Sequence, residues 1–293
     1  MDAVPFLFCE SVLSRFPEED VTEDLLQNLP KIWRGAAEAC SKIVHYAIRI
    51  EDKPDGQYVY EIYDFNMLAW LDLSDLLIKD LRYVQISSIA FQPFEEGENT
   101  TPISKDDLIQ KLIPIVCSLM PDPSFLSVGK ETHLDVLKPF LSLSKTKNLN
   151  FSYFGELSLE VLSKKLKTNP VKDLVLDGNW PDQVQDILIP RLLSGSLSKL
   201  RFTSTISINY VEAAFTKWKD TEGVAEFELG GRQSHDFCHY VLECSRRCEI
   251  YQYLQDPLQN KDQKEMLFVK GDRKLKCSFF EDPANPRFSL LTL

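Results

Sequence analysis

The chain has 293 residues, 44% of them hydrophobic and 26% charged, which is the composition of an ordinary globular protein with room for about two domains. Its net charge of −11 argues against nucleic acid and anionic membranes as partners, because both require a basic surface. No apolar run approaches the roughly 20 residues that span a bilayer, which argues against a transmembrane helix.

The seven cysteines are scattered along the chain without the regular spacing of a disulfide framework. Because disulfides persist mainly in oxidising compartments, we expect free thiols in a reducing one. The acidic start, Met1-Asp2, and the short apolar run after it do not fit a secretory signal peptide. The predicted location is therefore the cytoplasm, with the nucleus as the alternative.

Residues 1–41 are predicted to form a head of three short helices. The first places Val12, Leu13 and Phe16 on one stripe, and breaks at residues 17–20 and at Leu29-Pro30 separate the other two helices. Forty residues bury little apolar surface by themselves. We therefore expect this head to pack against a neighbouring part of the chain or against a partner.

One pattern in the head consists of Val4, Pro5, Val12, Leu13, Phe16, Asp20, Val21, Ile32, Trp33 and Ala36, and the chain opens with the motif M-D-x-V-P-F-x-F-C-E-x-V. The pattern resembles an F-box, and the opening motif resembles that of a large nematode family of F-box-like proteins. The resemblance implies that the head binds the small adaptor subunit of a cullin-based (SCF-type) ubiquitin ligase. It also implies that a C-terminal leucine-rich or related repeat region holds a protein substrate. The expected adaptor contacts are Pro5, Leu13, Phe16 and Trp33, and the alternative is a helical cap on the repeats.

Residues 42–82 are predicted to form a linking hairpin and a helix. Apolar residues alternate over residues 44–50 and 58–65, and residues 53–56 are of types that favour turns. Together these features indicate two antiparallel strands joined by a turn. The segment from Leu68 to Leu81 has apolar residues at helical spacing, with room for a turn near Asp72.

Residues 83–263 are predicted to form a leucine-rich-repeat-like α/β solenoid with parallel strands. Four segments share apolar residues at positions 1, 4 and 6, except that Thr146 is polar at position 1. Their central residues are Leu149, Leu174, Leu200 and Phe227, spaced by 25, 26 and 27 residues. A nearly constant period of this length is typical of stacked strand–helix units. The alternative is an ordinary α/β domain whose strands happen to be evenly spaced.

Helices are predicted between and after these strands, at residues 157–167, 181–193, 208–219 and 234–247. Weaker strand signals lie near residues 84 and 126. Between them, a polar loop covers residues 95–101, and a helix capped by Ser104 runs to Met120 with a kink at Pro114. Residues 264–293 are predicted to form a capping hairpin, 266–270 with 274–280, and a tail. Such a hairpin would cover the last open edge of the repeats.

No catalytic or metal-binding constellation is predicted, so we expect no enzyme activity and no cofactor. The best zinc candidates are His235, Cys238, His239, Cys244 and Cys248, but their spacing matches no zinc-finger template. Ser234, His235 and Asp236 are consecutive, and consecutive helical residues do not face one another. The chain contains neither a phosphate-binding loop nor a nucleophile elbow.

The candidate substrate-binding residues lie between the apolar positions of the repeat strands, and therefore point to the other face of the sheet. They are Asn150, Asp173, Val175, Asp177, Lys199, Arg201, Glu226 and Glu228. Their mixed charges suit a protein partner of complementary charge. The alternative is that this face is only solvated and binds no partner. The predicted function is a substrate-recognition adaptor of a ubiquitin ligase. The alternative is a repeat-based protein-binding module without a ligase.

Overall fold

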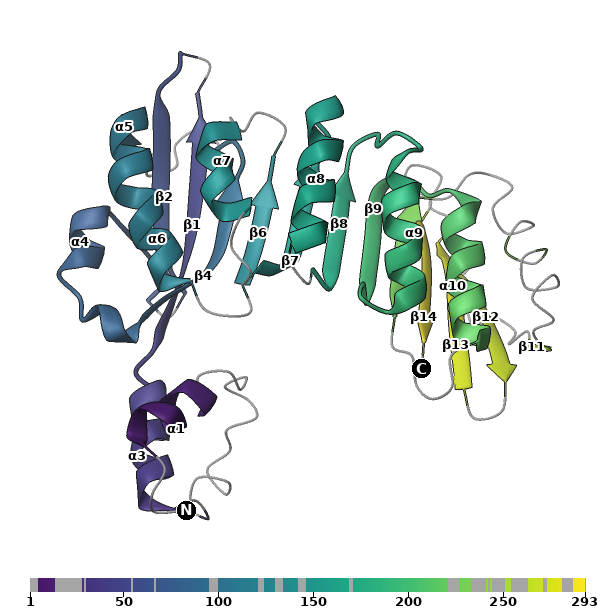
Figure 1. Cartoon of the computed structure of the whole chain (residues 1–293), viewed down its shortest axis with the longest axis horizontal. Coiled ribbons are helices and arrows are strands. Elements are labelled where there is room, and N and C mark those ends of the chain that lie inside the picture. The colour runs from purple at the N-terminus through teal and green to yellow at the C-terminus, as the bar shows by residue number, and fades with distance from the viewer. Residues whose placement is uncertain are drawn as a thin grey trace. The chain divides into compact units, whose positions relative to one another are not determined.

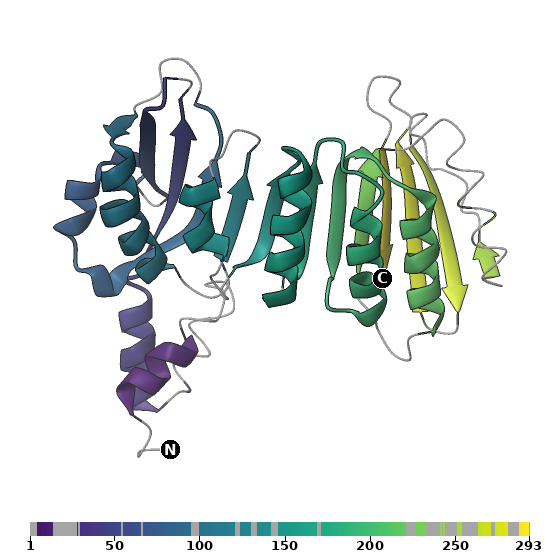
Figure 2. The same ribbon diagram turned by 45° about the horizontal axis from the view of Figure 1, so that its top comes forward.

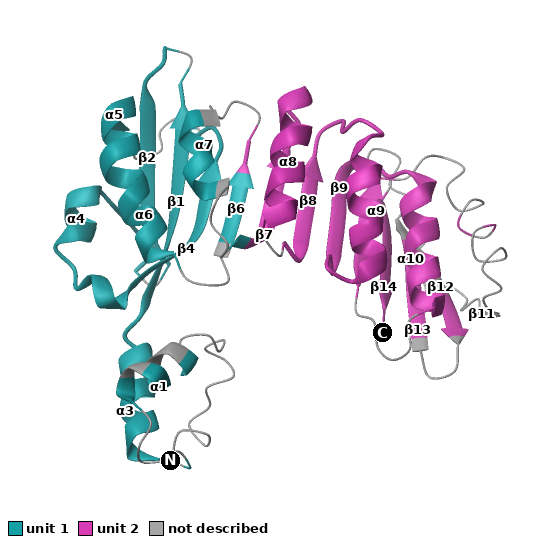
Figure 3. Ribbon diagram, viewed as in Figure 1, with its two compact units in different colours: residues 1–127, 131–146 teal, residues 128–130, 147–293 magenta. Residues whose placement is uncertain are grey.

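The computed structural model of the chain describes residues 5–13, 28, 30–53, 55–65, 67–94, 100–120, 124–129, 134–141, 146–168, 171–220, 227–232, 241, 243, 251–253, 263–270, 273–280 and 287–292. These residues form a mixed α/β protein (Figure 1). The chain divides into two compact units, one of residues 1–127 and 131–146 and the other of residues 128–130 and 147–293 (Figure 3).

The sheet of the first unit has the strand order β6-β4-β1-β2-β3, with β5 also paired to β2. The predicted hairpin is confirmed, since β1 and β2 are antiparallel with Ile50 opposite Tyr60. The predicted strands near residues 84 and 126 are confirmed as β4 and β6, and β4 runs parallel to β1. The bounds are β1 Val44–Asp52, β2 Tyr58–Asp64, β3 Ala69–Leu71, β4 Val84–Phe91, β5 Thr101–Ile103 and β6 Ser124–Val128.

The helix expected over residues 68–81 is only partly correct. Residues 69–71 instead form β3, which pairs with β2, and a short helix, α4 (Leu73–Leu77), begins after it. Asp72 starts that helix, because its carboxylate accepts a hydrogen bond from the Asp75 N–H at 2.8 Å in a capping box. A 3₁₀ turn, η2 (Leu81–Tyr83), leads into β4. Pairing with β2 therefore decides the structure of residues 69–71, although the spacing of apolar residues over 68–81 favours a helix.

The helix predicted from Ser104 to Met120 is present in three consecutive pieces: α5 (Lys105–Asp107), a π-helical turn η3 (Leu108–Leu112) and α6 (Ile113–Leu119). Ser104 caps it as expected, and its Oγ accepts a hydrogen bond from the Asp107 N–H at 3.1 Å. The wide turn lies directly before Pro114, which has no N–H to donate to the preceding turn. Helix α7 (Leu134–Leu141) and strand β5 were not predicted.

The second unit contains four neighbouring parallel strands joined by three helices, which we call the βα array. The strands lie in the order β7-β8-β9-β10, and the helices all cover the same face of the sheet (Figures 1 and 2). The bounds in chain order are β7 Thr146–Ser152, α8 Glu156–Thr168, β8 Asp173–Asp177, α9 Val184–Ser194, β9 Lys199–Thr205, α10 Ile208–Asp220 and β10 Glu228–Arg232. Adjacent parallel strands and their three intervening helices were predicted, and both are confirmed.

The first three strands of the array follow the predicted register, with Leu149 opposite Leu174 and Leu174 opposite Leu200. The fourth strand is shifted by two residues from the expected alignment, because Leu229 rather than Phe227 lies opposite Leu200. In the observed register Gly231 occupies the next inward position, where there is little space for a side chain. A Cβ atom there would lie 3.0 Å from Cβ of Ile206 and 3.4 Å from Cβ of Phe202.

The buried face of the array is apolar, as expected. Leu149, Leu174, Leu200 and Leu229 form one row that contains no exposed side chain. Leu176, Phe202 and Phe227, which were predicted to be buried with them, are also buried. A single strand–helix repeat of this length cannot bury its apolar face alone. The buried rows therefore hold neighbouring repeats of the array together.

The C-terminal segment pairs differently from the expected cap. The hairpin of β12 (Gln263–Lys270) and β13 (Arg273–Phe280) is confirmed. However, an unpredicted strand, β14 (Arg287–Thr292), pairs antiparallel with β10 and separates it from the hairpin. Phe288 and Leu290 of β14 continue the buried rows, which explains its place in the sheet. Strand β11 (Tyr251–Tyr253) pairs with β12. Of the helix predicted at 234–247, the structure describes only Val241 and Glu243, both helical.

Candidate protein-binding sites

The first candidate site is a pair of N-terminal helices, α1 (Phe6–Leu13) and α3 (Lys31–Cys40), which we call the helix pair. The carbonyl of Pro5 accepts hydrogen bonds from the N–H groups of Phe8 and Cys9 and so begins α1. The two helices pack through four buried side chains, and Ile32, Trp33 and Cys40 lie partly buried against them. The four are Cys9, Leu13, Ala36 and Ala37. This core is small.

Large apolar side chains of the helix pair lie outside that core. Phe6 is 41% exposed and Phe8 is 54% exposed. The Phe8 ring meets the Trp33 ring edge-to-face, with the centroids 6.3 Å apart. The buried indole N–H of Trp33 forms no hydrogen bond within the described part of the chain. The surface next to the core is therefore aromatic and carries an unsatisfied buried donor, which costs free energy.

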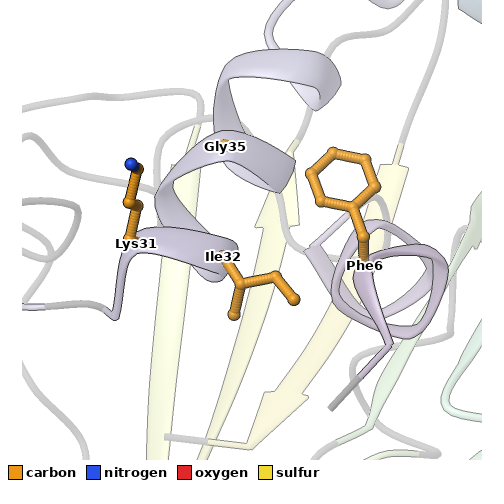
Figure 4. A pocket seen from close by; sticks show the side chains of 4 residues that line it. All are labelled: Phe6, Lys31, Ile32 and Gly35. Atoms are coloured by element: carbon orange, nitrogen blue, oxygen red, sulfur yellow. The ribbon is translucent and has the colours of Figure 1, made fainter. Parts of the chain in front are cut away.

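An open hollow of about 430 Å³ lies between the two helices of the pair. Phe6 lines it from α1, and Lys31, Ile32 and Gly35 line it from α3 (Figure 4). A Cβ atom on Gly35 would make an ordinary contact of 3.5 Å with the Phe6 ring. Glycine therefore keeps the hollow open at this point, and the apolar walls suit an apolar side chain of a partner.

The expected adaptor contacts differ in accessibility. Pro5 is exposed and Trp33 is half-buried, whereas Leu13 is only 6% exposed and packs inside the helix pair. Phe16 lies outside the described residues. Phe6, Phe8 and Ile32 were not predicted as adaptor contacts. The alternation of two phenylalanines at positions 6 and 8 was the available signal, because residues two apart do not share one helix face.

The second candidate site is the polar face of the βα array, which we define as the sheet face opposite α8, α9 and α10. Strand pairing brings the predicted residues into two rows across the sheet. One row contains Asn148, Asp173, Lys199 and Glu228, and the other contains Asn150, Val175, Arg201 and Gly230. Glu226 lies outside the described residues, so its predicted place in these rows stays a prediction.

Charges on the polar face are partly neutralised by each other. The Arg201 Nε donates to Glu228 Oε1 at 2.8 Å, and Nη2 of the same guanidinium lies 2.5 Å from that oxygen. Asp177 accepts hydrogen bonds from the Thr203 hydroxyl at 2.5 Å and from the Ser152 hydroxyl at 3.1 Å. These contacts join neighbouring strands and hold the acidic and basic groups in place. Lys199 remains exposed beside them.

The helices of the array also bury two lysines, Lys165 on α8 and Lys217 on α10. Burial lowers the pKa of Lys165 to about 8, because the charged form loses its hydration. The pKa of Lys217 is lowered for the same reason, and its ammonium group lies 5.3 Å from the centre of the Phe227 ring. Both lysines lie on the helix-covered side of the array and not in the candidate binding rows.

A third surface, around β3 and α4, was not anticipated as a site. Seven large apolar side chains between residues 65 and 81 are exposed, and Met67, Leu68 and Ile78 are the most open. Leu68 also has a left-handed backbone with φ of 51°. The seven are Phe65, Met67, Leu68, Trp70, Leu77, Ile78 and Leu81. Large apolar side chains that are exposed close together are typical of protein interfaces.

Other site classes find little support in the part of the chain that the structure covers. Among those residues no group of three or more His, Cys, Asp or Glu side chains could hold a metal ion. The zinc candidates from His235 to Cys248 lie outside them. Among the described residues, Cys9, Cys40, Cys117 and Cys277 form no disulfide bond. None of the described helices is long and apolar enough to cross a membrane.

Comparison of the chain with models of known protein families and with curated proteins found no match. The function of this α/β protein is therefore inferred from the surfaces that its structure presents.

Proposed function

We propose that this protein is a substrate-recognition adaptor of a cullin-based ubiquitin ligase. In this proposal the helix pair belongs to an F-box-like head that binds the ligase's small adaptor subunit. The βα array is a leucine-rich-repeat-like solenoid whose polar face binds a protein substrate. The protein itself is non-catalytic and needs no cofactor, and it works in the cytoplasm or the nucleus.

The observation that carries the proposal is the mismatch between the small core of the helix pair and the aromatic surface beside it. Among the described residues, four buried side chains pack between the two helices, yet Phe6 and Phe8 are exposed next to an apolar hollow. Large aromatic side chains beside a hollow are the usual anchors of protein interfaces. The residues of the F-box resemblance, from Val4 to Ala36, belong to the same part of the chain. A partner that covers this surface would complete the burial of the head.

The array supports the second half of the proposal. Its strands are parallel and sequential, and its helices cover one face, which leaves the polar face for binding. The charged groups on that face alternate in sign from strand to strand, from Asp173 to Lys199 to Glu228. Such a pattern favours a partner with complementary charges over an apolar one.

The test is co-expression of the full chain with the small adaptor subunit, followed by purification of the complex. We expect a stable complex that is lost when residues 1–41 are removed. Phe8→Ala should weaken adaptor binding by tens-fold or more, because truncating an interface anchor costs about 2 kcal/mol or more. Leu193→Ala is the matched control, because Leu193 is also an exposed apolar residue but lies on α9.

A wild-type chain that binds no adaptor would overturn the ligase proposal. Leu13→Ala is less informative about the interface, because Leu13 is buried inside the helix pair and its truncation disturbs folding first. Gly35→Leu is a sharper variant, since it fills the hollow from α3 without removing any core side chain. We expect it to block the adaptor while the array stays folded.

The alternative proposal is a protein-binding module without a ligase connection. The exposed apolar surface around β3 and α4 favours it, since this surface provides a protein contact that the F-box-like head does not need. Under this alternative the deletion of residues 1–41 would leave partner binding unchanged. Affinity capture with the full chain and with the deletion variant separates the two proposals.

A further inference from the structure

Two arginines face each other across neighbouring strands at the edge of the polar face. Arg232 of β10 lies directly opposite Arg287 of β14 in the antiparallel register. The residues beside them, Gly231 and Phe288, also pair, and Phe288 is buried on the helix side. Because side chains alternate along a strand, both arginines point to the polar face. Both are exposed.

Directly opposite positions on an antiparallel pair place Cβ atoms roughly 5 Å apart, and like charges there are destabilising. Neither arginine forms an ion pair within the described part of the chain. Arg201, the nearest predicted site residue on the same face, is already bound to Glu228. Arg232 and Arg287, which form no ion pair with another described residue, thus place two positive charges side by side on a protein whose net charge is −11.

A third group extends this site. Thr205 of β9 lies opposite Arg232 on its other side and is exposed, so its hydroxyl lies on the same face. The Arg232 backbone is held in place, because its carbonyl accepts a hydrogen bond from the Ile206 N–H at 3.0 Å. Three adjacent strands therefore present two guanidinium groups and one hydroxyl, all of which donate hydrogen bonds.

We propose that Arg232 and Arg287, assisted by Thr205, bind an anionic side chain of a protein segment that crosses β9, β10 and β14. The anion is a carboxylate or a phosphate monoester, because the guanidinium fork binds both through two parallel hydrogen bonds. An anion between the two arginines also removes their mutual repulsion. This inference rests on the proposed role of the polar face in substrate binding and names the chemistry recognised there.

The test measures fluorescence anisotropy of three labelled peptides with the full chain. The probes are a hexaglutamate peptide, a peptide with one phosphoserine in a glycine–serine sequence, and the same peptide without phosphate. We expect at least one anionic peptide to bind more tightly than the neutral one. Tighter binding of the hexaglutamate peptide identifies the anion as a carboxylate, and tighter binding of the phosphoserine peptide identifies it as a phosphate monoester. Equal binding of all three peptides would overturn the proposal.

Matched variants assign the binding to the arginine pair. R232Q/R287Q should bind the anionic peptide about tenfold or more weakly than wild type, because the hydrogen bonds between the guanidinium groups and the anion are lost. R232K/R287K keeps the charge but loses the fork, so it should bind with intermediate affinity. R82Q removes an exposed arginine in the first unit and should bind like wild type. Unchanged binding by R232Q/R287Q would overturn the proposal.

Thermal unfolding gives an independent readout. Because the pair is repulsive without its ligand, R232Q/R287Q should have a melting temperature equal to or above that of wild type. A lower melting temperature would contradict the repulsion on which the site is argued. Adaptor binding to the helix pair is measured separately. Its absence would overturn the ligase role while the anion-binding result stands.

Discussion

The helix pair and the βα array differ in how much of their surface each buries by itself. In the helix pair, four of the described side chains are buried between the helices and two phenylalanines are exposed. The array buries continuous rows of leucine and phenylalanine across β7, β8, β9, β10 and β14. A region that buries its own apolar residues is stable alone, whereas a region that exposes them depends on a partner. The predictions below test this difference.

The largest expected effect is in the array. Leu174→Ala or Leu200→Ala should lower the free energy of unfolding by roughly 2–5 kcal/mol, because each leaves a cavity in a fully buried row. Chemical denaturation followed by circular dichroism measures the loss. Val175→Ala, on the polar face of the same strand, should cost about 1 kcal/mol or less. Equal losses for Leu174→Ala and Val175→Ala would contradict the assignment of the two faces.

The same truncation in the helix pair should have a local effect. Leu13→Ala should cost about 2 kcal/mol, at the low end for a buried leucine, because its core is small and collapses more readily. We expect faster amide hydrogen exchange in α1 and α3 only, with unchanged protection in β8 and β9. Loss of protection throughout the chain would show that the helix pair is part of the array's core.

The buried Lys165 of α8 predicts a pH dependence for the stability of the array. Burial lowers its pKa in the folded state to about 8 from the ordinary 10.5. The unfolded state therefore holds more protons between pH 8 and 10.5, and the free energy of unfolding should rise with pH across this window. Lys165→Met should stabilise the array near pH 7 and flatten the rise. Denaturant titrations at pH 7.5 and 9.5 measure both effects.

The smallest effects come from a matched pair of glycines, one in each region. Gly195 ends α9 with a left-handed φ of 76°, so Gly195→Ala should destabilise by about 1 kcal/mol through backbone strain alone. Gly35 lies inside α3, where alanine is the better helix former, so Gly35→Ala should stabilise α3 by up to about 1 kcal/mol. Melting temperatures of the two variants should shift in opposite directions. Shifts of the same sign would contradict the assigned conformations.

Elements whose signals are local could be predicted from the sequence. The 1-4-6 pattern correctly located β7, β8 and β9, because alternation over a few residues decides which face of a strand is buried. The hairpin of β1 and β2 and the cap at Ser104 also depend on neighbouring residues alone. The predicted polar row was likewise a consequence of alternation, which is why its described members lie on one face.

The remaining features depend on contacts between residues far apart in the chain. The register of β10 is shifted by two residues from the predicted one, and in the observed register Gly231 lies close to Phe202 and Ile206. β3 replaces part of a predicted helix because β2 offers an edge for pairing.

What the sequence by itself determined is thus the order of strands and helices in the array and the side of each strand that is apolar. Both follow from residues close together in the chain. Only the tertiary structure decided which strands are neighbours at the C-terminal edge, where β14 and not the hairpin pairs with β10. It alone brought Arg232 and Arg287 opposite each other, because strand pairing joins segments that no local pattern connects.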